Sequence, residues 1–191
     1  PLNQNGKAQA QAASKFLKDV SIQKAFSSSL SRPKETAQII LKEHPGIDIS
    51  LKDNLIEIGH GKWEGKLESE IKSDWPDLLK MWKSLPEKVQ MPDGENIKEV
   101  SKRSITGWME ICKSLKNDET ALVVAHDAVN KTILCHLLGL TPSEIWMVKQ
   151  GNGGITVIDL SEKEDQPDQI TCLNITSHLG GVIDSTASGA L

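Results

Sequence analysis

The chain has 191 residues with a formal net charge of −4 and a pI near 5.8; 38% of the residues are hydrophobic and 25% are charged. This length and balance are typical of a globular domain with its own core. The acidic pI argues against a nucleic-acid or anionic-membrane partner, because proteins that bind either are normally basic. No apolar run approaches the ~20 residues that span a bilayer.

No motif in the sequence indicates a cofactor. The three cysteines are an odd number without a CxxC pair, so free thiols in a reducing compartment are expected. The five histidines show no HxH or HExxH spacing, which argues against a metal site. A Walker loop and a GxGxxG motif are also absent from the sequence. We therefore expect neither a cofactor nor a bound metal.

Hydrophobic periodicity predicts helices that alternate with strands in the first part of the chain. Ala12, Phe16 and Val20 recur every four residues beside Ala13 and Leu17, as on one face of a helix that follows a turn at 1–6. A later helix has Pro33 in its first turn, where proline is favoured. The strand candidates are 24–26 and 47–51, and the second helix candidate is 34–44.

The rest of the chain predicts a loop, three helical stretches and three strands. The run at 121–125, ALVVA, is continuously apolar, which is typical of a strand buried on both faces. Ile105, Met109 and Cys112 mark one stripe of a long amphipathic helix, and Trp108, Ile111 and Leu115 lie beside this stripe. The candidates are a glycine-rich loop at 55–66, helices at 67–82 with an interruption near Pro76, at 97–115 and at 129–138, a turn at 92–96, and strands at 121–125, 154–160 and 169–176.

Strands alternating with helices indicate an α/β fold with a mostly parallel sheet between layers of helices. No internal repeat or linker is visible, so residues 1–191 are expected to form a single domain. Ligands of parallel α/β sheets bind outside the carboxyl ends of the strands. Reactive side chains at those ends are therefore the first candidates for a functional site.

His126 stands at such an end, directly after the apolar run at 121–125. A histidine there could bind an anion, transfer protons or hold a metal. The alternative is a structural histidine that caps or supports the following helix. The local sequence leaves both interpretations open.

Arg32 follows the first strand candidate at the start of a helix. The chain has two arginines against twenty lysines, so an arginine suggests a site that needs a planar, two-pronged donor. Such a fork fits a phosphate or carboxylate, and the helix N-terminus would add its dipole. A surface ion pair with Glu35 is the alternative.

Glu57 lies between Ile56 and Ile58 in the glycine-rich loop. Partial burial would raise the pKa of this carboxyl and prepare it to protonate a leaving group. Glu64 and His60 in the same loop compete for that role. Taken together, a cationic fork, a proton donor and an imidazole are the parts needed to hold and cleave a phosphate monoester. The expected ligand is a small phosphorylated metabolite.

Five motifs occur in an order that resembles the histidine phosphatase superfamily, also called the phosphoglycerate mutase-like family. They are PLNQNGKAQA, SSSLSRPKETA, LIEIGHGKWEG, PDGEN and LVVAHDAVNK, and the resemblance extends through HLLGL and QGNGGITVIDL. It implies a three-layer α/β/α sandwich. More narrowly, the sequence is similar to the C-terminal half of two-domain, 2-carboxyarabinitol-1-phosphate phosphatase-like proteins of cyanobacteria and plastids. That similarity implies a cytoplasmic or plastid-stroma location and leaves a second domain upstream as an open alternative.

The resemblance implies a metal-independent phosphohistidine mechanism with a role for each candidate. Arg32 would bind the phosphate, Glu57 would be the proton donor, and His126 would stabilise charge on the transferred group. The family nucleophile, a histidine in an Arg-His-Gly motif at the end of the first strand, is absent from the sequence. Because PLNQNG normally follows that motif, we expect an N-terminally truncated domain that lacks its first strand and is inactive alone.

Asp127 departs from the family pattern, which has glycine after the second histidine. It places a negative charge beside the expected phosphate site. Two interpretations stay open: Asp127 takes part in substrate binding, or its side chain points away and only its backbone faces the site. Trp63, Trp75 and Trp82 are candidates for pocket walls, with packing in the core as the alternative.

A phosphatase is the leading functional hypothesis, and a mutase is the first alternative. Mutases of this family carry a longer insertion with basic residues after the glutamate loop. Here the segment Gly65–Met91 is short and contains no arginine, which favours the phosphatase. The second alternative is a noncatalytic domain that binds phosphorylated ligands or supports a partner domain.

Overall fold

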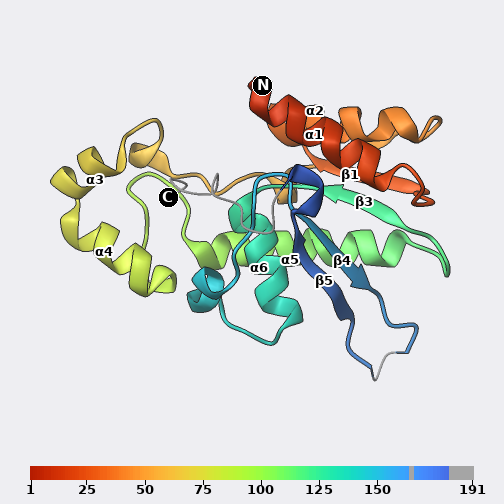
Figure 1. Ribbon diagram of the computed structural model, residues 1–191. Helices are drawn as coiled ribbons and strands as arrows, with labels where there is room; N and C mark the ends of the chain where they lie inside the picture. The colour runs from red at the N-terminus through yellow and green to blue at the C-terminus, as the bar shows by residue number, and fades with distance from the viewer. Residues whose placement is uncertain (164–165, 181–191) are drawn as a thin grey trace.

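Three parallel strands form the central sheet of the molecule, and helices lie on both of its faces (Figure 1). The structure is a computed structural model that describes residues 1–163 and 166–180. The strand order is β2-β1-β3, and Phe26 in β1 stands between Ser50 and Val123 of the neighbouring strands. The strands are β1 (Lys24–Ser28), β2 (Ile49–Lys52) and β3 (Ala121–Val124).

One pair of helices covers each face of this sheet (Figure 1). On one face α2 contacts β1 and β3, and α1 packs against α2. On the other face Phe26 of the sheet belongs to a buried cluster with Val100 of α5 and Val129 of α6. The helices are α1 (Gln4–Leu17), α2 (Ser31–Ile40), α5 (Ile97–Ser114) and α6 (Asp127–Leu137). The expected α/β fold with a parallel sheet is therefore confirmed.

The burial expected for the apolar run at 121–125 is wrong. Every residue of this run is half-buried, and β3 pairs with β1 alone among the described strands. The two remaining strands, β4 (Ile155–Asp159) and β5 (Gln169–Ile175), pair antiparallel with each other in a second sheet. Within the described residues β3 is thus an edge strand, which explains why its side chains stay partly exposed.

Two short helices project at one side of the sheet, on the left of Figure 1. α3 (Glu68–Asp74) ends just before Pro76, which begins α4 (Pro76–Ser84). Proline suits the first turn of a helix because its missing N–H would have no partner there, so the expected interruption is confirmed. Trp63 and Trp82 are each 2% exposed and belong to the core. Core packing is therefore the correct interpretation for these two tryptophans.

The apolar faces expected on two helices coincide only in part with their buried faces, since Ala13 and Ile111 are buried as expected. On α1, Phe16 is 47% exposed, whereas Ala13 and Ser14 are buried. The Ser14 hydroxyl donates to the Ile39 carbonyl of α2 at 3.1 Å. On α5, Met109 is also 47% exposed, and small residues fill much of the buried face. Close packing between helices selects small side chains here, which a count of apolar residues does not detect.

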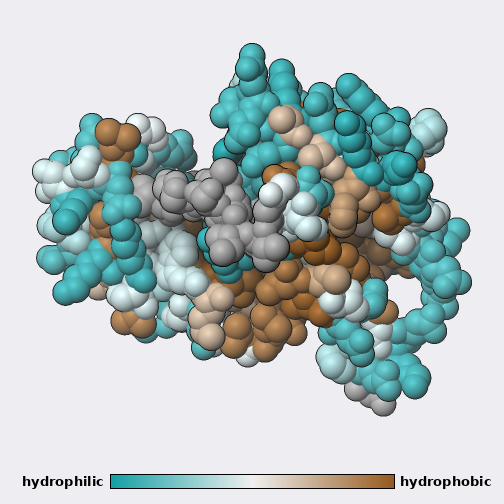
Figure 2. All heavy atoms as spheres, viewed as in Figure 1, coloured by the Kyte–Doolittle hydropathy of each residue, from teal (hydrophilic) through white to brown (hydrophobic). Residues whose placement is uncertain are grey.

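The outer surface of α1 and α2 is largely hydrophilic, as the top of Figure 2 shows. Apolar residues gather lower down on the same view, over the region where Figure 1 places α6, β4 and β5. In the part of the chain that the structure describes, no helix is both long enough and apolar enough to cross a bilayer.

Candidate active site

The carboxyl ends of the three parallel strands bring distant parts of the chain to one edge of the sheet. Ser28 ends β1, and Arg32 follows in the first turn of α2. Glu57 follows β2 after the short 3-10 turn Asp53–Leu55. His126 comes directly after β3 and is the N-cap of α6. Because the strands run in the same direction, these four side chains emerge on the same side of the sheet.

His126 is a buried imidazole held by the end of the neighbouring strand. It is 7% exposed, and its Nε2 lies 2.9 Å from the Ser28 hydroxyl. Burial, and secondarily the positive charges of Arg32 and Arg103, lowers the pKa of His126 to about 4. The imidazole is therefore neutral near pH 7 and fixed in its orientation by Ser28.

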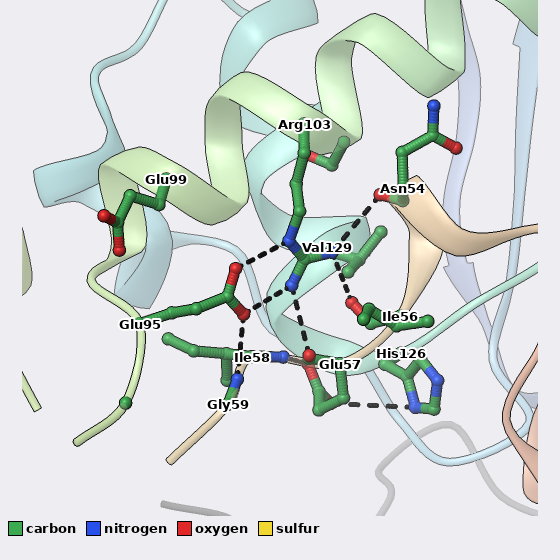
Figure 3. A network of polar contacts seen from close by, with 12 residues as sticks. Asn54, Ile56, Glu57, Ile58, Gly59, Glu95, Glu99, Arg103, His126 and Val129 are labelled. Carbon is green, nitrogen blue, oxygen red and sulfur yellow. Dashed lines mark hydrogen bonds and ion pairs between the residues drawn. The ribbon is translucent and has the colours of Figure 1, made fainter. Parts of the chain in front are cut away.

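Glu57 faces His126 across a short gap (Figure 3). Its Oε2 lies 3.9 Å from Nδ1 of His126, and its Oε1 accepts a hydrogen bond from the Ile58 amide at 3.0 Å. Burial raises the pKa of Glu57, the charge of Asp127 adds to that effect, and Arg32 opposes it. Because the pKa of His126 is lowered, the contact between the two side chains is not an ion pair near pH 7.

Arg32 is an exposed cation close to both titratable groups. Its charge lowers the pKa of His126 and works against the rise in the pKa of Glu57, so the guanidinium acts on both. The alternative ion pair with Glu35 does not form. Glu35 instead accepts from the Leu2 amide at 2.8 Å and lies 3.4 Å from Nζ of Lys7. The position of Arg32 in the first turn of α2 thus places its charge near Glu57 and His126, and Glu35 does not hold it.

Asp127 is the first residue of α6 and is engaged by a lysine one helical turn away. Its Oδ2 accepts from Nζ of Lys131 at 2.7 Å, and that ammonium lies over the Trp146 ring, 4.9 Å from its centroid. The Asp127 carboxylate is nevertheless near enough to Glu57 to raise the pKa of that group. The charge of Asp127 therefore acts on the pKa of the proton donor candidate.

Glu64 and His60, the competing proton donor candidates of the glycine-rich loop, do not take the place of Glu57 beside His126. Glu64 is exposed, His60 is half-buried, and it is Glu57 that contacts His126. Trp75 is half-buried against the core, with Nζ of Lys66 5.3 Å from its ring centroid. Within residues 1–163 and 166–180, no three His, Cys, Asp or Glu side chains gather as a set of metal ligands.

Arg103 and Glu95 form a polar network behind Glu57 for which the sequence predicts no role (Figure 3). Arg103 Nε and Nη2 each donate to a Glu95 carboxylate oxygen at 2.8 Å. The same guanidinium donates to the Asn54, Ile56 and Glu57 carbonyls at 3.2, 2.6 and 3.1 Å. The one available signal was composition, since Arg103 is the second of two arginines among many lysines. Ser28 left no comparable signal.

Comparisons with known proteins agree with this geometry. The family model of the histidine phosphatase superfamily (branch 1) matches residues 1–173. The chain is 31% identical over 179 residues to phosphoserine phosphatase 1 of Hydrogenobacter thermophilus, covering 94% of this chain and 82% of that protein. It is 28% identical over 173 residues to 2-carboxy-D-arabinitol-1-phosphatase of Triticum aestivum, covering 91% of this chain and 34% of that longer protein.

Solved structures extend the likeness to three dimensions. The structure of Bacillus stearothermophilus YhfR superimposes with a TM-score of 0.85 at 26% identity, covering 94% of this chain and 87% of that chain. The family match spans all three strand ends that meet at the site and includes Arg32, Glu57 and His126. The chain therefore belongs to the histidine phosphatase superfamily.

Proposed function

We propose that the complete protein hydrolyses phosphomonoesters of small metabolites through a phosphohistidine intermediate. The observation that carries this proposal is the Glu57 carboxyl, with a raised pKa, 3.9 Å from the neutral imidazole of His126. A phosphatase needs a protonated acid beside the phosphoryl group, and this environment keeps a carboxyl protonated to higher pH. The named relatives, which are phosphatases, support the same reaction class.

Each of the three side chains has a distinct task in the proposed reaction. Arg32 binds phosphate oxygens with its guanidinium fork. A histidine nitrogen attacks phosphorus while the bond to the alcohol oxygen breaks, and Glu57 gives its proton to that oxygen. Glu57, now a carboxylate, then takes a proton from the water that attacks phosphorus as the N–P bond breaks. A bound phosphate dianion favours a positive charge on His126, so the imidazole becomes a stronger donor when substrate is present.

The attacking histidine in this proposal is not one of the five in the sequence. None of them stands in an Arg-His-Gly motif, and His126 is assigned to charge stabilisation. The proposed reaction therefore requires a nucleophile that these 191 residues do not supply. We expect negligible turnover from the 191-residue chain by itself and activity from the complete protein.

We infer the substrate class from the relatives and from the segment after the glutamate loop. Their names specify phosphoserine and 2-carboxy-D-arabinitol 1-phosphate, both small phosphorylated acids. The segment Gly65–Met91 forms the short projecting helices and contains no arginine, which fits a small ligand. A sugar phosphate or sugar-acid phosphate is the proposed substrate, with Asp127 as a candidate determinant of which one binds.

Three substitutions in the complete protein test the assignment. Arg32→Ala, Glu57→Gln and His126→Ala should each lower kcat/KM for small alkyl phosphates by about 10²- to 10⁴-fold, the range for loss of an acid or a charge-stabilising group. Glu64→Gln, in the same loop but exposed, is the matched control and should retain activity. Wild-type rates in all three site variants would refute the assignment.

Interconversion of phosphoglycerates without release of inorganic phosphate would favour a mutase instead.

A further inference from the structure

Every N–H of the Arg103 guanidinium has a partner, and all of these partners lie in two loops. Two N–H groups bind the carboxylate of Glu95 side by side, at 2.8 Å each. The other three bind the carbonyls of Asn54, Ile56 and Glu57. The side chain is 19% exposed. Because the guanidinium is planar and each of its hydrogen bonds is directional, these bonds together hold both loops in place relative to α5.

Glu95 continues the same network to the far side of Glu57. Its Oε2 accepts from the Gly59 amide at 2.9 Å, and its own amide donates to the Gly59 carbonyl at 2.7 Å. The backbone on both sides of Glu57 is therefore held, at residues 54–57 by Arg103 and at Gly59 by Glu95. Neither Arg103 nor Glu95 is hydrogen-bonded to the Glu57 carboxyl, which points toward His126 (Figure 3).

We propose that the Arg103–Glu95 pair is a positioning device for the proton donor of the proposed hydrolysis. It holds the peptide of Glu57 so that the carboxyl faces His126 at 3.9 Å and not open solvent. Arg103 and Glu95 are positioning residues, since they act through the backbone of residues 54–59 and leave the reacting groups to Arg32, Glu57 and His126. This inference rests on the assignment of Glu57 as the acid.

The electrostatic setting supports a positioning role for this pair. Arg103 is the smallest of the three causes that lower the pKa of His126, after burial and Arg32, so its charge is a minor influence on the reacting groups. Burial acts to raise the pKa of Glu95, but the pKa is lowered overall by the hydrogen bonds and charge of Arg103 and by the Gly59 amide. The lowered pKa favours the ionised carboxylate of Glu95, the form that accepts both N–H groups of Arg103. A lysine at position 103 could not replace the fork, because a single ammonium cannot reach a carboxylate and three carbonyls at once.

Comparing substrates with different leaving groups distinguishes a misplaced acid from general damage to the site, because only a poor leaving group needs the acid. An alkyl phosphate such as phosphoserine needs a proton on its leaving oxygen, whereas p-nitrophenyl phosphate releases a stable phenolate with little help. In the complete protein, Arg103→Ala and Glu95→Gln should lower kcat/KM for phosphoserine by roughly 100-fold, the effect of a misplacement near 1 Å. The same variants should change kcat/KM for p-nitrophenyl phosphate by less than about threefold, and Arg103→Lys should not rescue the loss. The comparison uses kcat/KM because hydrolysis of the phosphohistidine, the second step, is common to both substrates.

Glu110→Gln is the matched control. Glu110 lies on the same helix and forms an exposed ion pair at 3.1 Å with Lys52, at the end of the strand before the loop. Its removal should affect neither substrate. Amide hydrogen exchange on the 191-residue chain adds a readout without activity: Arg103→Ala should accelerate exchange at 54–59 while α6 keeps its protection.

The possible outcomes distinguish this inference from the proposed function. If Glu57→Gln does not lower kcat/KM for phosphoserine more than kcat/KM for p-nitrophenyl phosphate, the assignment of the acid itself fails. If Glu57→Gln shows that selective loss but Arg103→Ala and Glu95→Gln lower both substrates equally, or neither, the positioning role is wrong and the assignment of the acid stands. An Arg103→Ala variant that does not fold leaves Glu95→Gln to decide.

Discussion

Burial acts in opposite directions on the two titratable side chains that face each other in the site. It raises the pKa of Glu57 and lowers the pKa of His126 to about 4, because in both cases it favours the neutral form. Near neutral pH the imidazole carries no charge, while the carboxyl keeps its proton to higher pH than an exposed glutamate does. Two neighbouring groups whose pKa values are perturbed by one environment are typical of acid–base sites.

The pH dependence of hydrolysis should report the pKa of Glu57. The acid must be protonated in the first step, so kcat/KM should fall as pH rises through its pKa, at a midpoint above 4.5. Asp127→Asn removes a negative charge that raises this pKa, so the falling limb should move to lower pH. The measurement is a pH–rate profile of the complete protein with an alkyl phosphate. A limb that is unchanged in Glu57→Gln would assign the titration to another group.

Among individual residues, the sequence was sufficient to predict those site candidates that lie directly at strand ends. Arg32, Glu57 and His126 could be predicted because each follows a strand candidate or lies in a glycine-rich loop, and the structure brings them together. Arg103 and Ser28 could not be assigned a role, because the carbonyls that Arg103 binds and the histidine that Ser28 contacts lie far away in the sequence. The Arg103 side chain bonds to residues 46–49 positions earlier, and Ser28 meets His126 across 98 positions.

Among the elements, the junction between the glutamate loop and the turn at 92–96 places the acid. Here two backbone segments touch with no space for a side chain. A Cβ on Gly94 would lie 2.4 Å from the Gly59 carbonyl oxygen, and one on Gly61 would lie 2.2 Å from that of Pro92. The Lys62 amide also donates to the Pro92 carbonyl, at 2.8 Å. Glycine is required at these positions because the two backbones approach so closely.

Two glycine substitutions across this junction should differ sharply in their cost. Gly94→Ala must push the turn away from the loop, so we expect a loss of about 1–3 kcal/mol in the free energy of unfolding, as for overpacking elsewhere. Gly59→Ala faces the same turn, but its Cβ would meet ordinary contacts at 3.8 Å or more, so the loss should be under about 1 kcal/mol. Urea unfolding of the 191-residue chain measures both. Equal losses would show that the close approach does not limit this junction.

The existence of most elements could be predicted from the sequence, but their buried faces could not. The helices and strands fall close to the expected ranges, since hydrophobic period, Pro33 and Pro76 are local signals. The expected stripe of Phe16 on α1 and of Met109 on α5 is exposed instead. The buried positions of α1 hold small residues, and those of α5 include Ser101, Ser104 and Gly107, whose burial depends on which helix packs beside them.

In the whole molecule, the parallel direction of three strands creates the site. β1, β2 and β3 come from residues that are far apart in the sequence, and each delivers one functional segment to the same edge. The α/β class could be predicted because strands alternated with helices. The partial exposure of β3 could not be predicted from the sequence, because a continuous apolar run is compatible with an edge strand as well as with a central strand.

The response of His126 to inorganic phosphate tests most directly whether Arg32, Glu57 and His126 form one phosphate site. In the 191-residue chain with labelled histidines, a phosphate titration followed by NMR should give a saturable shift of the His126 ring signals, identified by their loss in His126→Asn. Bound phosphate should also raise the pKa of His126 from about 4, because it supplies a negative charge. Arg32→Ala should abolish both effects. Ring signals that do not respond to phosphate, or that respond equally without Arg32, would contradict the site.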